Sequence, residues 1–175
     1  QDVPANRVYA GSKESADHGP AGDPEGEPSG ERDGTAILYD PADRYSDSRA
    51  TARTVFGRDL PDAHLAAIAS AASGSSTRVI AESANEITLR TTGPLYKGGV
   101  IRSVVRQKDG TLACENHEFK LNDKGTGLGT ILFAEQVRGL RAAGVSQIRT
   151  FAAGDPEVGR NFNGFYTWPM LGYDG

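Results

Sequence analysis

The hydrophobic pattern of this chain changes its period once, and that change limits the folds open to it. Two strand-like runs, residues 99–106 and 111–121, flank Lys108-Asp109-Gly110, whose Asp-Gly step supplies the positive φ angles of a tight hairpin. Over residues 127–143 the apolar positions instead recur every three or four residues, as on a helix that packs against a sheet. The pattern therefore predicts a hairpin followed by a long amphipathic helix.

A second strand pair precedes this hairpin. Residues 77–82 and 86–91 are rich in β-branched side chains, and Ser83-Ala84-Asn85 between them is typical of a turn. Before them, the alanine-rich residues 60–72 place apolar side chains on one stripe and predict a short amphipathic helix. These segments predict two consecutive hairpins with a helix in front of them.

The segment after the long helix completes the expected sheet. Gly144 is placed to end that helix, and residues 146–153 form a buried, strand-like run. Because a strand–helix–strand connection is almost always a right-handed crossover, this run should lie parallel to the strand that ends at Leu121. We therefore expect an α+β fold, with a mixed, mostly antiparallel sheet, one parallel crossover strand and flanking helices.

The first part of the chain differs in composition from the rest. Residues 1–45 concentrate glycine, proline and acidic side chains, and such a stretch buries too little apolar surface to offset the entropy lost on ordering it. We expect residues 1–45 to be a flexible, acidic, linker-like segment, in which residues 36–39 at most form a short strand, and residues 46–175 to be the folded domain. Because the chain begins at Gln1 in linker-like sequence, we also expect it to belong to a longer polypeptide.

The charge and the cysteine content exclude several functions. A net charge of -4 and a pI of about 5.4 argue against general nucleic-acid binding and against attachment to an anionic membrane. No apolar run approaches the roughly 18 residues of a membrane span, so we expect a cytoplasmic protein. Cys114 lies in a strand-like run, which favours a half-buried core residue over a nucleophile.

A glycine-rich turn joins the later hairpin to the long helix, and its sequence is Lys124-Gly125-Thr126-Gly127-Leu128-Gly129-Thr130. Unpaired N–H groups and the helix dipole favour an anion at a helix start, and glycine lets phosphates approach the backbone. The spacing fits neither a P-loop, which needs Gly-Lys-Ser or Gly-Lys-Thr, nor a dinucleotide-binding turn. A simple phosphate or nucleotide site is a weaker alternative.

The same turn resembles the pyrophosphate loop of the GNAT N-acetyltransferase superfamily, Gln/Arg-x-x-Gly-x-Gly/Ala, with Lys124 in the first position and Gly127 and Gly129 after it. Over roughly residues 98–173 the order of elements is similar too: two long antiparallel strands, the loop, a helix, a strand and the terminal Trp168-Pro169-Met170-Leu171-Gly172-Tyr173. The resemblance implies the C-terminal half of a GNAT fold in a divergent or truncated member.

The resemblance also implies that the chain binds acetyl-CoA or another acyl-CoA. In that family the amides after the first basic residue hold the cofactor pyrophosphate, and the pantetheine arm pairs with a splayed strand before the loop. The cofactor-binding residues implied in this chain are Phe119, Lys120, Leu121, Lys124, Gly125, Thr126, Gly127, Leu128, Gly129, Thr130 and Asn161.

Several side chains are candidates for acid–base catalysis. In the family a tyrosine of the last helix can protonate the departing thiolate, and the resemblance implies Tyr166 here. Candidates for the general base are Glu115, His117 and Glu118, on the strand before the loop. Strand alternation predicts that Glu115, His117 and Phe119 share one face of the sheet and that Glu118 lies on the other.

The leading hypothesis is an acyl-CoA-dependent N-acyltransferase that transfers the acetyl group directly to an amine, whose identity the sequence leaves open. The alternative is a non-catalytic GNAT-like structural or partner-binding module of a larger phage or mobile-element polypeptide. One departure motivates the alternative: the family places two acceptor-binding helices between its first two strands, whereas Ser83-Ala84-Asn85 is only a turn.

Overall fold

The computed structural model describes residues 34–40, 47–123 and 125–150 of the 175-residue chain. Within these ranges the chain forms six strands in one sheet, together with three helices. In chain order the elements are β1 (Ala36–Tyr39), α1 (Ser48–Phe56), α2 (Asp62–Ile68), β2 (Ser76–Ser83), β3 (Glu86–Thr92), β4 (Tyr96–Arg106), β5 (Leu112–Leu121), α3 (Leu128–Ala142) and β6 (Val145–Thr150).

The sheet confirms the expected α+β class. Its strands lie in chain order from β1 to β6, and β2, β3, β4 and β5 are successively antiparallel. The crossover through α3 makes β6 parallel to β5, as expected from the strand–helix–strand rule. A second parallel pair, between β1 and β2, was not expected. It arises because α1 and α2 follow β1 in the chain and return it to the end of the sheet where β1 began, so that β2 runs in the same direction.

The connection between β1 and β2 corrects one expectation from the sequence. The hairpin around Ser83-Ala84-Asn85 joins the second and third strands, so the absence of helices there says nothing about the first connection. Helix α1, which the hydrophobic pattern did not reveal, begins at Asp47, whose Oδ1 accepts hydrogen bonds from the N–H groups of Arg49 and Ala50 at 3.0 and 3.1 Å. It ends at Gly57 in a left-handed conformation with φ of 72°.

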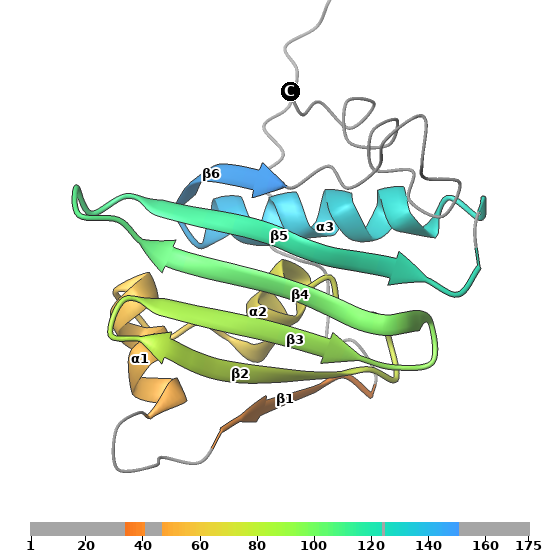
Figure 1. The fold of residues 1–175 in the computed structure, drawn as a ribbon, viewed down its shortest axis with the longest axis horizontal. Helices are drawn as coiled ribbons and strands as arrows, with labels where there is room; N and C mark the ends of the chain where they lie inside the picture. Colours follow the sequence, from red (N-terminus) through yellow and green to blue (C-terminus); the bar gives the residue numbers. More distant parts are fainter. Residues whose placement is uncertain (1–33, 41–46, 124, 151–175) are drawn as a thin grey trace, which may run out of the picture.

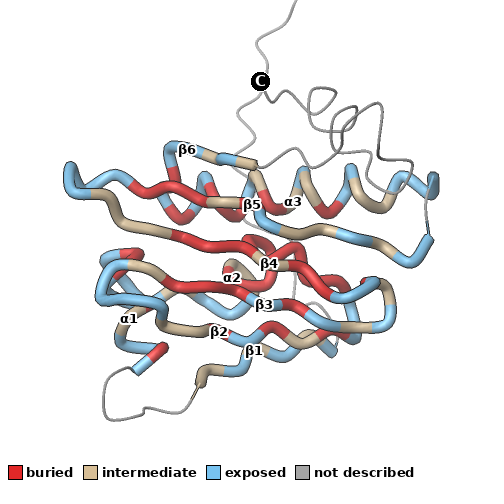
Figure 2. Tube along the Cα trace, in the orientation of Figure 1, coloured by how far each residue is buried: buried red, intermediate tan, exposed pale blue. Residues whose placement is uncertain are grey.

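All three helices cover the same face of the sheet (Figure 1). The main core contains Val55 of α1, Ile68 of α2 and Leu140 of α3, packed against strand residues such as Leu89 and Val104. Figure 2 shows the buried residues concentrated along the central strands and the helices behind them. Among the described residues no helix covers the opposite face, which we call the open face. None of the described helices is long and apolar enough to cross a bilayer.

Helix α2 is shorter than the sequence predicts. It ends at Ile68, and residues 69–72 form a buried turn in which Ser70 has a left-handed φ of 55°. The Tyr96 hydroxyl donates a hydrogen bond to the Ser70 carbonyl at 2.5 Å and accepts one from the Ala72 N–H at 2.8 Å. The small side chains that suggested more helix therefore let this turn pack against the sheet.

A β-bulge in β5 corrects the predicted alternation of its side chains. Ser103 of β4 lies opposite Glu115, and Arg102 lies opposite Asn116, but the next β4 residue pairs with Glu118. The extra residue, His117, shifts the alternation by one position. His117 and Glu118 therefore both lie on the open face with Glu115, whereas Phe119 lies on the helix-covered face. The prediction that Phe119 shares a face with Glu115 and His117, and that Glu118 lies on the other, is wrong.

The crossing of α2 and α3 supplies a test of the fold. A β-carbon on the buried Gly139 would lie 2.9 Å from Ala67 Cβ and 3.2 Å from the Ile68 nitrogen, which is too close for normal contact. We predict that Gly139→Val lowers the free energy of unfolding by about 1–3 kcal/mol through overpacking, measured by urea denaturation. Ala134→Val, at an exposed position of the same helix, should cost only the roughly 0.5 kcal/mol of helix propensity. Equal losses for the two variants would contradict this close crossing.

Candidate functional site

The strand before the glycine-rich turn runs past the end of its parallel neighbour. β6 pairs with β5 from Leu112 to Asn116, where Thr150 lies opposite Asn116. Residues 117–121 continue toward the turn with β4 on one side and no other described strand on the other (Figure 1). Backbone N–H and C=O groups on that side are thus placed to pair with an extended ligand, as at any strand edge.

The side chains of residues 117–121 lie on both faces of the sheet. Phe119 and Leu121 pack beneath α3, in a small cluster with Tyr96, Val100 and Leu132. On the open face, the Lys120 ammonium lies 2.7 Å from the Glu118 carboxylate. In the segment predicted to hold the pantetheine arm, the apolar side chains of Phe119 and Leu121 therefore belong to the core, and the backbone lies along the edge of the described sheet.

The glycine-rich turn is exposed and open. Gly125 and Gly127 adopt left-handed φ angles of 77° and 76°, and a β-carbon built on either would meet no atom within 4 Å. Gly129, in the first turn of α3, lies against the segment just described, since its β-carbon would be 3.5 Å from the Phe119 ring and 3.7 Å from Leu121. The end of β5 and the start of α3 therefore form one continuous surface.

Some backbone N–H groups at this helix start are already paired. The Leu128 N–H donates to Thr126 Oγ1 at 3.4 Å, and the Thr130 N–H donates to the Gly127 carbonyl at 3.1 Å. Within the described part of the chain the N–H groups of Thr126, Gly127 and Gly129 have no such partner. The predicted set of anion-binding amides is thus reduced to the loop glycines and their nearest neighbours.

Three predicted site residues cannot be placed. Lys124, Asn161 and Tyr166 lie outside the described residues. The proposed proton donor and part of the predicted cofactor set therefore stay predictions from the sequence alone.

Two of the base candidates, Glu115 and His117, lie in a row of polar side chains across the open face. His117 Nε2 is 3.0 Å from Ser103 Oγ, and Ser103 Oγ is 3.1 Å from Thr88 Oγ1. Glu115 Oε2 is 4.0 Å from His117 Nε2, and Glu115 Oε1 is 3.5 Å from Arg149 Nη1. Ser103 and Arg149 belong to no motif; they join the row because the strand register puts both opposite Glu115.

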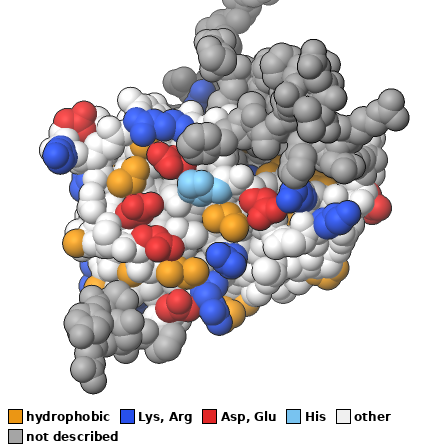
Figure 3. Space-filling view, in the orientation of Figure 1, with side chains coloured by type: hydrophobic (Ala, Val, Ile, Leu, Met, Phe, Trp, Pro, Cys, Tyr) orange, Lys and Arg blue, Asp and Glu red, His pale blue; other side chains and the backbone are white. Residues whose placement is uncertain are grey.

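This face mixes charges of both signs, as Figure 3 shows for the side of the sheet away from the helices. Both carboxylates nearest His117 have cationic neighbours, Arg149 for Glu115 and Lys120 for Glu118. The imidazole is 36% exposed, so a ligand on the open face can reach it. In the ranges described, no three His, Cys, Asp or Glu side chains converge as ligands of a metal ion.

A buried polar cluster lies on the other face of the same strand. Gln136 of α3 donates from Nε2 to Asn116 Oδ1 at 2.6 Å, and both side chains contact the Cys114 thiol at 3.8 Å. Asn116 is 2% exposed, and Gln136 and Cys114 are fully buried. This cluster joins α3 to β5 and is shielded from any ligand on the open face.

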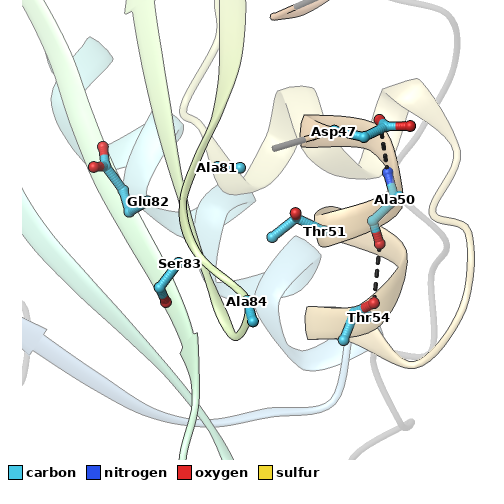
Figure 4. A pocket seen from close by; sticks show the side chains of 8 residues that line it. All are labelled: Asp47, Ala50, Thr51, Thr54, Ala81, Glu82, Ser83 and Ala84. Atoms are coloured by element: carbon cyan, nitrogen blue, oxygen red, sulfur yellow. Dashed lines mark hydrogen bonds between the residues drawn. The ribbon is translucent and has the colours of Figure 1, made fainter. Parts of the chain in front are cut away.

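A hollow bounded by described residues lies away from the glycine-rich turn. It has a volume of about 500 Å³ and is lined by Asp47, Ala50, Thr51 and Thr54 of α1 and its cap, and by residues 81–84 at the tip of the β2–β3 hairpin (Figure 4). That tip lies at the end of the sheet where β5 starts, because Glu86 pairs with Val105 of β4 and Val105 pairs with Ala113 of β5. The glycine-rich turn follows the opposite end of β5. The hollow is therefore separate from the candidate site, and we assign it no chemistry.

Comparisons with known proteins give little beyond this geometry. No family model and no curated protein matches the chain. A solved acetyltransferase structure from Trypanosoma brucei is similar over 52% of this chain, with 19% sequence identity and a TM-score of 0.33. The chain covers 63% of the length of that protein. A likeness this weak carries no argument about function.

The buried Cys114 thiol tests whether the interface between α3 and β5 excludes solvent. Burial raises the pKa of Cys114 to about 12, so in the folded protein the thiol stays protonated up to that pH. We predict that the native protein does not react with a thiol-specific disulfide reagent at pH 8, and that one thiol reacts after unfolding in guanidinium, followed by absorbance. Rapid labelling of the native protein would show that the interface between α3 and β5 is open to solvent.

Proposed function

We propose that this chain is an acyl-CoA-dependent N-acyltransferase, which transfers an acetyl group directly from acetyl-CoA to an amine. The observation that carries the proposal is the continuity between the part of β5 that runs past its pairing with β6 and the glycine-rich start of α3. An extended amide-bearing arm and a diphosphate are the two parts of a ligand that such a surface fits.

The residues at the turn suit a diphosphate. The left-handed Gly125 and Gly127 leave open space where a side chain would stand, so oxygen atoms can approach the backbone closely. The amides of Thr126, Gly127 and Gly129 supply donors, and the positive end of the α3 dipole adds to the attraction. These interactions favour a diphosphate in spite of the negative charge of the whole chain, because they depend on the backbone.

The strand edge suits the arm that joins the diphosphate to the thioester. Residues 121 back to 117 span roughly 13 Å of strand at about 3.3 Å per residue. An arm that pairs along this edge leads from the turn toward the bulge at His117. The bound cofactor supplies an activated acyl group as a thioester.

The transfer requires one proton acceptor near the thioester. The amine nitrogen forms a bond to the carbonyl carbon, the carbon–sulfur bond breaks, and the thiolate leaves with the bonding pair. His117 takes the proton that the amine loses, and the nearby Glu115 carboxylate stabilises the resulting imidazolium. Glu115 and Glu118 are poorer candidates, since their carboxylates already pair with Arg149 and Lys120.

The first test is binding. We predict that titration calorimetry detects acetyl-CoA binding at millimolar concentration or tighter, and that Gly127→Ala weakens it by about tenfold or more, because a left-handed alanine costs roughly 1–2 kcal/mol and its methyl group occupies the approach to the amides.

The matched control lies at the other end of the same helix. Gly144 has a left-handed φ of 81° with open space around it, so Gly144→Ala carries the same backbone strain away from the turn. It should bind acetyl-CoA like the wild type. Absence of binding by the wild type would remove the enzyme proposal and favour a non-catalytic role.

The second test addresses the base. Acetylation of a panel of amines, including spermine and a lysine-rich peptide, is followed by release of the CoA thiol. With the best amine, His117→Gln should lower kcat by about 100-fold or more while the Kd for acetyl-CoA is unchanged. Glu118→Gln, the control on the same face, should stay near wild type. Full activity of His117→Gln would place the base elsewhere.

A further inference from the structure

The hydroxyl groups beside His117 form a chain that ends at one nitrogen of its ring. Thr88 Oγ1 lies 3.1 Å from Ser103 Oγ, which lies 3.0 Å from His117 Nε2. Ser103 is 5% exposed and Thr88 is 7% exposed. Each sits on a different central strand and is held there by backbone pairing, so the ring contacts a fixed polar atom. A buried hydroxyl in contact with an exposed base orients that base more strictly than water does.

The charged groups around the ring indicate which nitrogen carries the proton. Glu115 Oε2 approaches the same Nε2 atom at 4.0 Å, and a carboxylate there favours an N–H over a lone pair. The other charges on the open face of β5 and β6 are Glu118, Lys120 and Arg149; farther away lie Arg90 and Glu86 of β3 and Arg78 of β2. Glu118 pairs with Lys120 and Arg149 pairs with Glu115, while Arg90 lies two strands from β5, opposite Ile101.

We propose that Ser103 is a positioning residue for His117: it accepts a hydrogen bond from Nε2–H and thereby leaves the Nδ1 lone pair free on the open face. In this arrangement the Ser103 hydroxyl donates its own hydrogen bond to Thr88 Oγ1, so the chain of hydrogen bonds runs from the ring into the protein. The catalytic meaning, that Nδ1 takes the proton of the amine, rests on the proposed function. The assignment of the proton to Nε2 does not depend on the proposed function.

The geometry does not fit Ser103 as a nucleophile. In a Ser–His–carboxylate triad the serine and the carboxylate contact different nitrogens of the ring. Here both approach Nε2, and Ser103 is buried in the middle of a strand.

The test reads the tautomer by NMR in the full chain. The ¹⁵N shifts of both ring nitrogens are recorded at a pH where the histidines are neutral, and His117→Gln assigns the His117 signals among the three histidines. The wild type should show Nε2 protonated and Nδ1 unprotonated. In Ser103→Ala the difference between the two shifts should narrow toward that of free histidine, and Ser103→Thr, which keeps the hydroxyl, should restore it.

Two further variants sharpen the result. Glu115→Gln should also narrow the shift difference, because it removes the charge that favours Nε2–H. Thr92→Ala is the matched control, since it removes a hydroxyl from the cross-strand pair with Ser76, 3.4 Å apart, away from His117. It should leave the His117 shifts unchanged. A proton on Nδ1 in the wild type, or unchanged shifts in Ser103→Ala, would overturn the proposal.

Kinetics separate this proposal from the proposed function. With an amine that the wild type acetylates, Ser103→Ala should lower kcat by about tenfold without changing the Kd for acetyl-CoA, and Ser103→Thr should recover most of the loss. If kcat does not fall, Ser103 does not position the base. If the wild type acetylates no amine, the proposed function fails, and the NMR result alone decides whether Ser103 sets the tautomer.

Discussion

One extra residue in β5 determines what each face of the sheet presents. Because His117 bulges opposite the step between Ile101 and Arg102, the alternation before it carries Asn116 toward α3, and the alternation after it carries Phe119 to the same side. Without the bulge, Phe119 would lie on the open face and Glu118 on the helix-covered face. The bulge therefore lets one strand supply both an apolar support for α3 and a row of polar side chains on the other side.

The position of the glycine-rich turn depends on how α3 is held against β5. Leu132 and Leu140 pack into the two apolar clusters, and between them Gln136 hydrogen bonds to Asn116. A buried pair of amides tolerates little sliding, because a shift would leave polar atoms unpaired. The bulge and this pair together fix the first turn of α3 relative to the end of β5, which is the relation that the proposed ligand requires.

Much of this fold could be predicted from the sequence, since the Asp109-Gly110 turn and the change of hydrophobic period are local signals. What could not be predicted depends on contacts between distant residues. Helix α1 has a capping aspartate at Asp47 and a left-handed Gly57, but its few apolar positions are recognisable only once the sheet that buries them is known. The bulge leaves no mark in composition, so strand alternation predicts the wrong faces for Glu118 and Phe119. The candidate amides and bases lie in the glycine-rich turn and in the strand before it, where the sequence alone indicates them. Ser103 and Arg149 can be recognised only from the register of the strands.

The open face also bears on which amine the proposed reaction would use. The two carboxylates nearest His117 are each matched by a cation, Glu115 by Arg149 and Glu118 by Lys120, so the field that an approaching ligand meets near His117 is small. A polycation therefore gains little electrostatic attraction near His117. In the proposed transfer the attacking amine must also be neutral, because a protonated nitrogen has no lone pair. An uncharged amine loses less hydration on approaching a face of balanced charge than an ammonium group does. The arrangement therefore favours recognition of the acceptor through its shape and hydrogen bonds over recognition through charge.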